Sequence, residues 1–191
     1  MDTLDAIYSR RSIRKFTDAK VPAELIEKML EAATKAPSST NRQPWRFVVL
    51  EGAKKDEVVA ILVKRVVRLK RFKTLISGAA ATTNLMQSAP VLILVFNGAS
   101  RKRGLIRPLS TIVNVLDVQS IGGSIQTMLL AAQELGLGTV WLGYVFLAAR
   151  KIGQAVGKKE QLIAAVAVGY PHESPSPRPR KNWQDVTEWF K

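Results

Sequence analysis

The apolar residues of the chain gather in short runs that are separated by longer amphipathic stretches. Four runs rich in β-branched residues predict four largely buried strands: RFVVLE at 46–51, PVLILVF at 90–96, GTVWLGY at 138–144 and LIAAVAVGY at 162–170. Helical spacing of apolar residues predicts helices at 4–8, from Pro22 to just before Pro37, at 54–76 and at 111–135. Thr3 is the expected cap of the first helix. Strands that alternate with helices, without an internal repeat, predict an α/β or α+β domain.

Length and composition predict one domain. The chain has 191 residues, 47% of them hydrophobic, which suffices for a single core, so we expect one domain over 1–191. The N-terminus places acids before its bases and lacks an apolar segment of signal-peptide length. No uncharged apolar run reaches the length of a membrane span. We therefore expect a cytoplasmic protein with no membrane partner.

The residue types missing from the chain exclude several kinds of chemistry. Cysteine is absent, which excludes disulfides, thiolate catalysis and cysteine-ligated zinc or iron–sulfur centres. The single histidine, His172, lies in the Pro-rich stretch GYPHESPSPRPR, a poor position for a catalytic base or a metal ligand. We therefore expect no metal site and no catalytic side chain of these usual types.

The charge balance favours anionic partners. Lys and Arg total 29 against 15 Asp and Glu, which gives a formal net charge of +14. Such a balance suits nucleic acid, an anionic membrane, or a phosphorylated cofactor or substrate, and charge alone does not choose among them. Apart from Phe72, no aromatic residue interleaves with the basic run at 64–73, which argues against nucleic acid.

The stretch YSRRSIRKF, residues 8–16, concentrates part of this charge. Arg10, Arg11 and Arg14 supply forked donors and Ser12 supplies a hydroxyl, a set suited to a phosphate monoester. A solvated basic turn explains the same residues. Taken alone, the segment leaves both interpretations open.

Two further segments have features that suit a flat ligand. In PSSTNRQPW, residues 37–45, side-chain amides can read the edge of a heterocycle, although a capped loop explains them equally well. In ELGLGTVW, residues 134–141, Gly136 is the expected left-handed cap of a helix. Gly138 and Gly143 would allow the backbone to approach a flat ring closely.

Two basic stretches have no role that the sequence assigns. Lys64, Arg68 and Arg71 share one face of the predicted helix at 64–73. That face is either simply solvated or a dock for the extra phosphate of NADPH, for nucleic acid or for a membrane. The stretch 97–114 is basic as well and is a candidate lid.

The last 21 residues combine proline, charge and aromatic side chains. Composition from Pro171 onward is typical of a disordered tail, yet Trp183, Trp189 and Phe190 need a surface on which to be buried. We expect the tail to wrap over another surface, such as a partner subunit.

Four motifs follow one another along the chain: R-R-S-x-R-x-F at 10–16, P-S-S-x-N-x-Q-P-W-x-F at 37–47, L-L-A-A-x-x-L-G-L-G-T-x-W-x-G at 129–143, and G-Y-P at 169–171 with R-P-R at 178–180. Together they resemble the FMN-dependent nitroreductase family over nearly the whole chain. The resemblance implies an α+β, nitroreductase-like fold with a central, mostly antiparallel sheet flanked by helices. It also implies a homodimer that holds FMN between its subunits, with the tail at 171–191 wrapping the partner.

The resemblance assigns residues to each part of FMN. Arg10, Arg11 and Ser12 would hold the phosphate and ribityl end, helped by Arg178 and Arg180 from the tail.

Arg14 would lie near the pyrimidine side of the flavin, where a cation stabilises the charge that develops on reduction. The resemblance also assigns four residues of the other subunit to FMN: Pro37, Ser38, Ser39 and Asn41. The backbone of Leu142 and Gly143 would approach the flavin N5.

The function that the resemblance implies is hydride transfer from NADH or NADPH, through FMN, to a small electron-poor acceptor such as a nitroaromatic or a quinone. This chemistry needs no cysteine, metal or protein base. The alternatives are a specialised flavin enzyme of the same fold, such as a reductive dehalogenase or a flavin-consuming enzyme, or a basic flavin-carrying or nucleic-acid-binding protein with incidental turnover. The sequence determines neither the preferred nicotinamide nor the acceptor.

Overall fold

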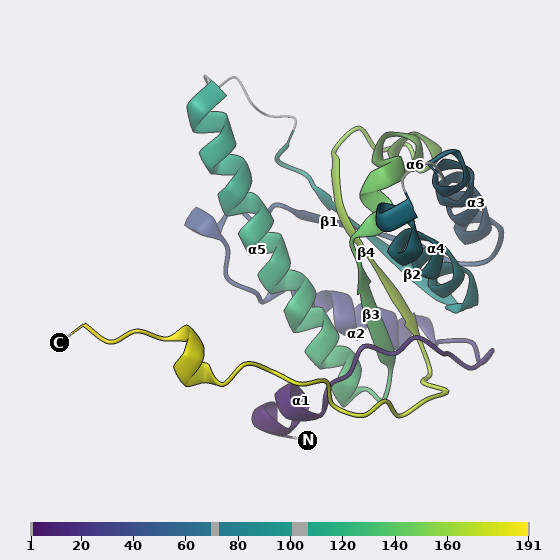
Figure 1. Cartoon of the computed structure of the whole chain (residues 1–191). Helices are drawn as coiled ribbons and strands as arrows, with labels where there is room; N and C mark the ends of the chain where they lie inside the picture. Colours follow the sequence, from purple (N-terminus) through teal and green to yellow (C-terminus); the bar gives the residue numbers. More distant parts are fainter. Residues whose placement is uncertain (1, 70–72, 101–106, 191) are drawn as a thin grey trace.

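An antiparallel β-sheet forms the centre of the molecule (Figure 1). The computed structural model describes residues 2–69, 73–100 and 107–190. Within these residues the strands are β1 (Trp45–Leu50), β2 (Val91–Asn97), β3 (Gly138–Leu142) and β4 (Gln161–Gly169), in the spatial order β1-β2-β4-β3 with every neighbouring pair antiparallel. The prediction of an α+β fold with a mostly antiparallel central sheet is therefore confirmed.

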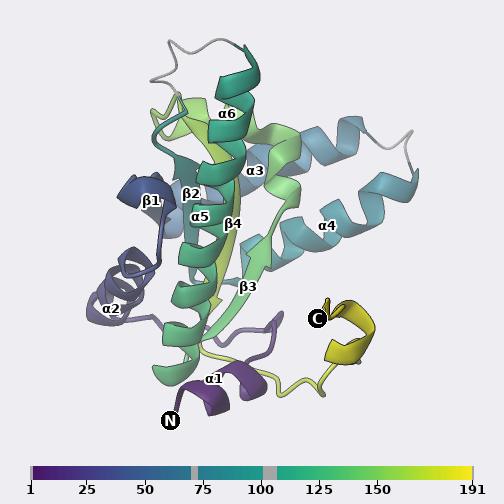
Figure 2. The same cartoon turned by 90° about the vertical axis from the view of Figure 1, so that its left-hand side faces the viewer.

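Helices cover both faces of the sheet, so the molecule has three layers (Figures 1 and 2). The α-helices are α1 (Thr3–Ser9), α2 (Ala23–Thr34), α3 (Gly52–Arg68), α4 (Lys73–Ser88), α5 (Arg107–Glu134) and α6 (Ala149–Ala155), and the 3-10 helices are η1 (Ser39–Asn41), η2 (Tyr144–Ala148) and η3 (Trp183–Val186). α2 and α5 lie on one face of the sheet, and α3, α4 and α6 lie on the other. None of the helices in the described part of the chain is long and apolar enough to cross a bilayer.

The continuous apolar run of β2 follows from burial on both faces. Side chains alternate along a strand, and those of β2 divide between two cores: Leu92, Leu94 and Phe96 on the α3–α4 side, and Val91, Ile93 and Val95 on the α2–α5 side. β1 is an edge strand in which only the first and last residues are buried, and Val49 is 40% exposed. The prediction of a largely buried strand is therefore wrong for β1.

Two details of the predicted helices differ from the structure. The single helix expected at 54–76 is wrong, because α3 ends at Arg68 and α4 begins at Lys73 and packs against it. Asp2 rather than Thr3 caps α1, since the Asp5 N–H donates to the Asp2 carboxylate at 2.9 Å. The predicted left-handed cap is confirmed, because Gly136 has a φ of +72°.

The tail from Pro171 onward runs away from the sheet (Figure 1). The aromatic side chains near its end are exposed to solvent. Trp189 is 75% exposed and Phe190 is 92% exposed. The tail therefore presents apolar surface that the rest of the chain does not cover. Two predictions from the basic stretches fall on residues outside the described ones, namely Arg71 and residues 101–106 of the candidate lid at 97–114.

Candidate functional site

The cationic segment 10–16 lies in extended form along the edge strand β3. Ser12 forms a parallel bridge with Thr139, and the Ile13 N–H donates to the Thr139 carbonyl at 2.9 Å. Gly138 permits this approach, because a Cβ there would lie 2.8 Å from an Ile13 side-chain atom. The expectation that Gly138 leaves room for a flat ligand is therefore wrong, since Ile13 fills that space.

The start of the tail is fixed to the other side of the same segment. The His172 N–H donates to the Lys15 carbonyl at 2.9 Å. The Glu173 carboxylate accepts hydrogen bonds from the backbone N–H groups of Arg14 and Lys15. These bonds set the direction in which the tail leaves the sheet, and they bring residues 175–180 beside the first arginines of the chain.

Five arginines converge on one small cavity of about 60 Å³, which we call the arginine hollow. Its lining consists of Arg10, Arg11, Arg14, Arg178 and Arg180 together with Ser12, Pro175 and Ser176. That volume is about the share of two water molecules in the liquid, which suits a small group rather than a ring. None of the described residues that line the hollow is acidic.

The electrostatics of the arginine hollow favour an anion. Burial lowers the pKa of Arg10, and the neighbouring charges of Arg180 and Arg11 lower it further. Arg11 is held by hydrogen bonds from its Nη1 to the carbonyls of Tyr8 at 2.6 Å and Arg10 at 2.9 Å. Like charges gathered without an acidic partner repel one another, so a bound phosphate group would relieve the repulsion.

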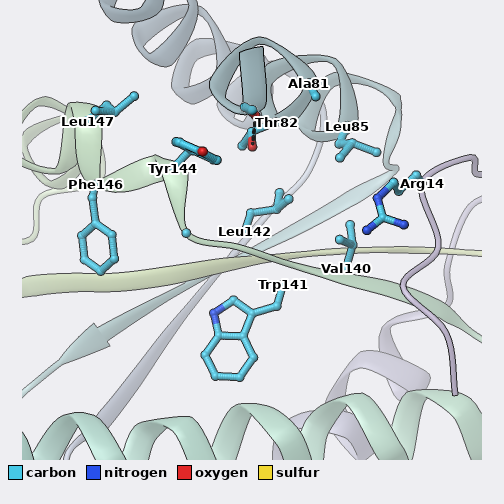
Figure 3. A pocket seen from close by; sticks show the side chains of 12 residues that line it. Arg14, Ala81, Thr82, Leu85, Val140, Trp141, Leu142, Tyr144, Phe146 and Leu147 are labelled. Atoms are coloured by element: carbon cyan, nitrogen blue, oxygen red, sulfur yellow. Dashed lines mark hydrogen bonds between the residues drawn. The ribbon is translucent and has the colours of Figure 1, made fainter. Parts of the chain in front are cut away.

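A larger, mostly apolar cavity of about 530 Å³ adjoins the hollow, and we call it the ring pocket (Figure 3). α4 forms one wall and the end of β3 with η2 forms the other, and the N-terminal segment contributes Arg14. Arg14 lines both the ring pocket and the arginine hollow. The two cavities thus offer a site for a phosphate next to a site for an apolar ring.

The predicted residues Leu142 and Gly143 lie at the end of β3 and line the ring pocket. Leu142 is buried, whereas the space beside Gly143 is open, because no heavy atom outside its chain neighbours lies within 4 Å of the position that a Cβ would take. The backbone at Gly143 is therefore accessible to a ligand in the pocket.

Sequence reasoning missed the wall that α4 contributes. A Cβ at Gly78 would lie 2.6 Å from the Tyr144 ring, so only glycine leaves room for Tyr144 in its observed position. Thr82, one turn later, donates to the Gly78 carbonyl at 2.9 Å and faces the pocket (Figure 3). The signal in the sequence was the run of small residues at 78–81, which is unusual beside an apolar core.

The predicted loop residues at 37–41 lie apart from both cavities, since none of them lines either one. The loop is strained, because Thr40, Asn41 and Gln43 all have positive φ values of 46–54°. It is held against α5 by the Ser39 N–H, which donates to the Ser120 hydroxyl at 3.1 Å. Within this chain, these residues therefore do not reach the arginines.

A buried carboxylate on α5 holds the same loop. Asp117 is 1% exposed, and its Oδ1 forms an ion pair with Arg42 Nε at 3.2 Å rather than a hydrogen bond. The other oxygen accepts from Asn97 Nδ2 at 3.4 Å. A buried charge of this kind is costly unless it is paired, so Arg42 and the loop that carries it are fixed in place.

Comparison with known proteins identifies relatives over nearly the whole chain. The sequence model described as "Nitroreductase family" matches residues 7–170. A protein of Methanothermobacter thermautotrophicus, provisionally named NADH dehydrogenase/NAD(P)H nitroreductase, is 33% identical over 182 residues, which cover 93% of this chain and 82% of that protein. Iodotyrosine deiodinase of Thermotoga neapolitana is 29% identical over 192 residues, which cover 93% of this chain and 92% of the deiodinase.

Solved structures share the fold as well. A provisionally assigned nitroreductase of Desulfovibrio desulfuricans, crystallised in complex with FMN, is 31% identical and superposes with a TM-score of 0.76 over 100% of this chain and 99% of its own. A BluB-like flavoprotein of Clostridium difficile is 28% identical, with a TM-score of 0.80 and full coverage of both chains.

Proposed function

The chain belongs to the nitroreductase family, and on that premise we propose that it is an FMN-dependent oxidoreductase. It takes electrons from NADH or NADPH and passes them to a small, flat, electron-poor acceptor such as a nitroaromatic or a quinone. The observation that carries the proposal is that Arg14 joins the arginine hollow to the ring pocket. FMN has a phosphate at one end and a flat ring at the other, which matches the charge of the hollow and the polarity of the pocket.

The residues of the arginine hollow fit the phosphate. Arg10, Arg11, Arg178 and Arg180 supply guanidinium forks and Ser12 supplies a hydroxyl. The described lining contains no carboxylate that would compete with an anion. Two of these arginines come from the tail, so the phosphate would tie the tail to the N-terminal segment.

The residues of the ring pocket fit the flavin ring. When bound, FMN supplies the two-electron chemistry of the reaction. Arg14 would hold a positive charge at the edge of the ring, and the open backbone at Gly143, beside Leu142, would approach the flavin N5. The apolar wall formed by α4 would exclude water from one side of the site.

The active species would be a homodimer in which a second copy supplies Pro37, Ser38, Ser39 and Asn41. This part of the proposal is supported by the strained, firmly held loop that carries these residues and reaches neither cavity of its own subunit. Exposed apolar residues on α5, among them Ile112 and Val115, and those of the tail supply surface for a stable interface.

Flavin retention tests the proposal directly. We expect the purified protein to be yellow and to bind FMN more tightly than riboflavin, which lacks the phosphate. Arg10→Ala should weaken FMN binding by about 1.5–3 kcal/mol, roughly tenfold to a hundredfold. Lys28→Ala, which removes an exposed cation of α2, is the matched control and should bind FMN normally. Equal affinity for FMN and riboflavin in the unmodified protein would contradict the role of the hollow.

A second candidate reaction is reductive dehalogenation, which the 29% identity to the iodotyrosine deiodinase favours. It would use the same flavin site with a different acceptor. Iodide release from iodotyrosine, measured beside nitroaromatic and quinone reduction with the same preparation, distinguishes the two acceptors.

A further inference from the structure

A third cavity, of about 490 Å³, lies between the C-terminal half of α3 and the start of α6, and we call it the cationic cavity. Among the described residues, its lining includes five cations, Lys64, Arg65, Arg68, Arg150 and Lys151, and no acidic side chain. Phe146 and Leu147 line both this cavity and the ring pocket, so the two are neighbours. A volume of this size is typical of a small-molecule site.

The ordinary explanation of basic residues at a helix terminus accounts for only part of this lining. Arg65 and Arg68 lie in the last turn of α3, where cations offset the negative end of the helix dipole. Arg65 also forms a hydrogen bond that ties α3 to η2, since its Nε donates to the Leu147 carbonyl at 3.0 Å. Arg150 and Lys151 lie in the first turn of α6, at the positive end of that helix, where cations are unfavourable.

The described residues supply no acidic partner for most of the cations of the cavity. Within the described ranges, no carboxylate forms an ion pair with Lys64, Arg68, Arg150 or Lys151. Charges of one sign brought together by two helices raise the free energy of the folded chain, and a bound anion lowers it again. Both helices therefore favour an anionic ligand in the space between them.

We propose that the cationic cavity binds the 2′-phosphate of NADPH and makes NADPH the preferred electron donor; this rests on the function proposed above. A phosphate monoester carries about 1.5–2 negative charges at pH 7, whereas NADH has a neutral hydroxyl at the same position. Arg68 and Arg150 can bind the phosphate through two donors each. Phe146, 54% exposed between the two cavities, offers a flat face on which the adenine stacks.

Calorimetry on the flavin-saturated protein tests this site without turnover. The probes are adenosine 2′,5′-bisphosphate and 5′-AMP, which differ only in the 2′-phosphate. We expect the bisphosphate to bind at least tenfold more tightly. The double variant Arg68→Gln/Lys151→Gln should lose that preference, whereas the control Lys20→Gln/Lys28→Gln, which removes two exposed cations elsewhere, should retain it.

Steady-state kinetics supply the second readout. In the Arg68→Gln/Lys151→Gln variant, KM for NADPH should rise tenfold or more, while KM for NADH and kcat should stay unchanged. Equal binding of the two nucleotides, or an equal loss in the control pair, would overturn the proposal, as would binding of duplex DNA or anionic vesicles in place of the bisphosphate. If the protein binds no FMN but still prefers the bisphosphate through Arg68 and Lys151, the flavin function fails and the phosphate site stands.

Discussion

Arg14 lines both the arginine hollow and the ring pocket. In the proposed function it would therefore act on the ring of a bound flavin as well as on its phosphate end. Its Nη1 donates to the Ser12 carbonyl at 3.1 Å, which holds the side chain near the segment that carries it. Arg14→Ala should therefore affect the electronics of a bound flavin more than its affinity. Loss of one nearby charge is worth on the order of 1–4 kcal/mol.

That free energy corresponds to a fall in the two-electron reduction potential of about 20–90 mV. Spectral titration against reference dyes measures it, and FMN affinity should fall less than in Arg10→Ala. Arg14→Lys keeps the charge and should restore most of the potential. A potential in Arg14→Ala equal to that of the unmodified protein would restrict Arg14 to positioning the ligand.

Individual residues were predictable where their chemistry is specific. Arg10, Arg11 and Arg14 suggested a phosphate site as one of two interpretations, and only the family resemblance added Arg178 and Arg180; the structure gathers all five around one hollow. Glycines were less predictable, because glycine at a given position serves either a ligand or a neighbouring side chain. Gly138 makes room for Ile13 and Gly78 makes room for Tyr144, and neither partner is near its glycine in sequence.

At the scale of elements, Lys55 joins two helices that the sequence suggested were one. It lies on α3 and is only 8% exposed, and its Nζ donates to the carbonyls of Gln87 at 3.1 Å and Ala89 at 2.6 Å, at the end of α4. Lys55→Met keeps the apolar stem but leaves these terminal carbonyls without their donor. We expect a loss of about 1–3 kcal/mol in the free energy of unfolding, measured by urea denaturation.

The matched control for this prediction is Lys54→Met on the same helix. Lys54 is half-exposed and pairs with Glu57 at 2.8 Å, an exposed pair that contributes little to stability. Equal stability of the two variants would show that the carbonyls at the end of α4 find water instead.

The strands were predictable because their apolar runs end at turn residues. The separation of α3 from α4 was not, because no glycine or proline marks it and the apolar spacing continues through 54–76. Spacing identifies which side of a helix is apolar, but it does not say where the chain reverses. The exposure of β1 could not be predicted from its residues either, because a strand's place at the edge of a sheet depends on the order of the strands.

At the scale of the whole molecule, the tail is the feature whose apolar side chains remain uncovered in the single chain. Trp183, Trp189 and Phe190 are mostly exposed, and their apolar surface would be buried in the proposed homodimer. Deletion of residues 183–191 should raise the dimer dissociation constant at least tenfold, as measured by sedimentation velocity over a concentration series. Trp183→Ser/Trp189→Ser should have a similar effect.

Gln184→Ala provides the control for the tail, because it changes the same short helix without removing apolar surface. A dimer of unchanged affinity after the deletion would mean that α5 alone supplies the interface. Composition indicates only that the aromatic residues of the tail need a cover, and the family resemblance is what assigns that cover to a partner subunit.

The arginine hollow joins the two ends of the chain, with residues 10–14 on one side and 175–180 on the other. The last strand of the sheet, β4, ends at Gly169, before the tail residues of the hollow begin. A chain cut between Gly169 and Pro175 therefore keeps every strand of the described sheet and loses one side of the anion site. Under the proposed function, such a chain would fold its sheet and yet bind FMN poorly, so that removal of the tail would separate folding from cofactor binding.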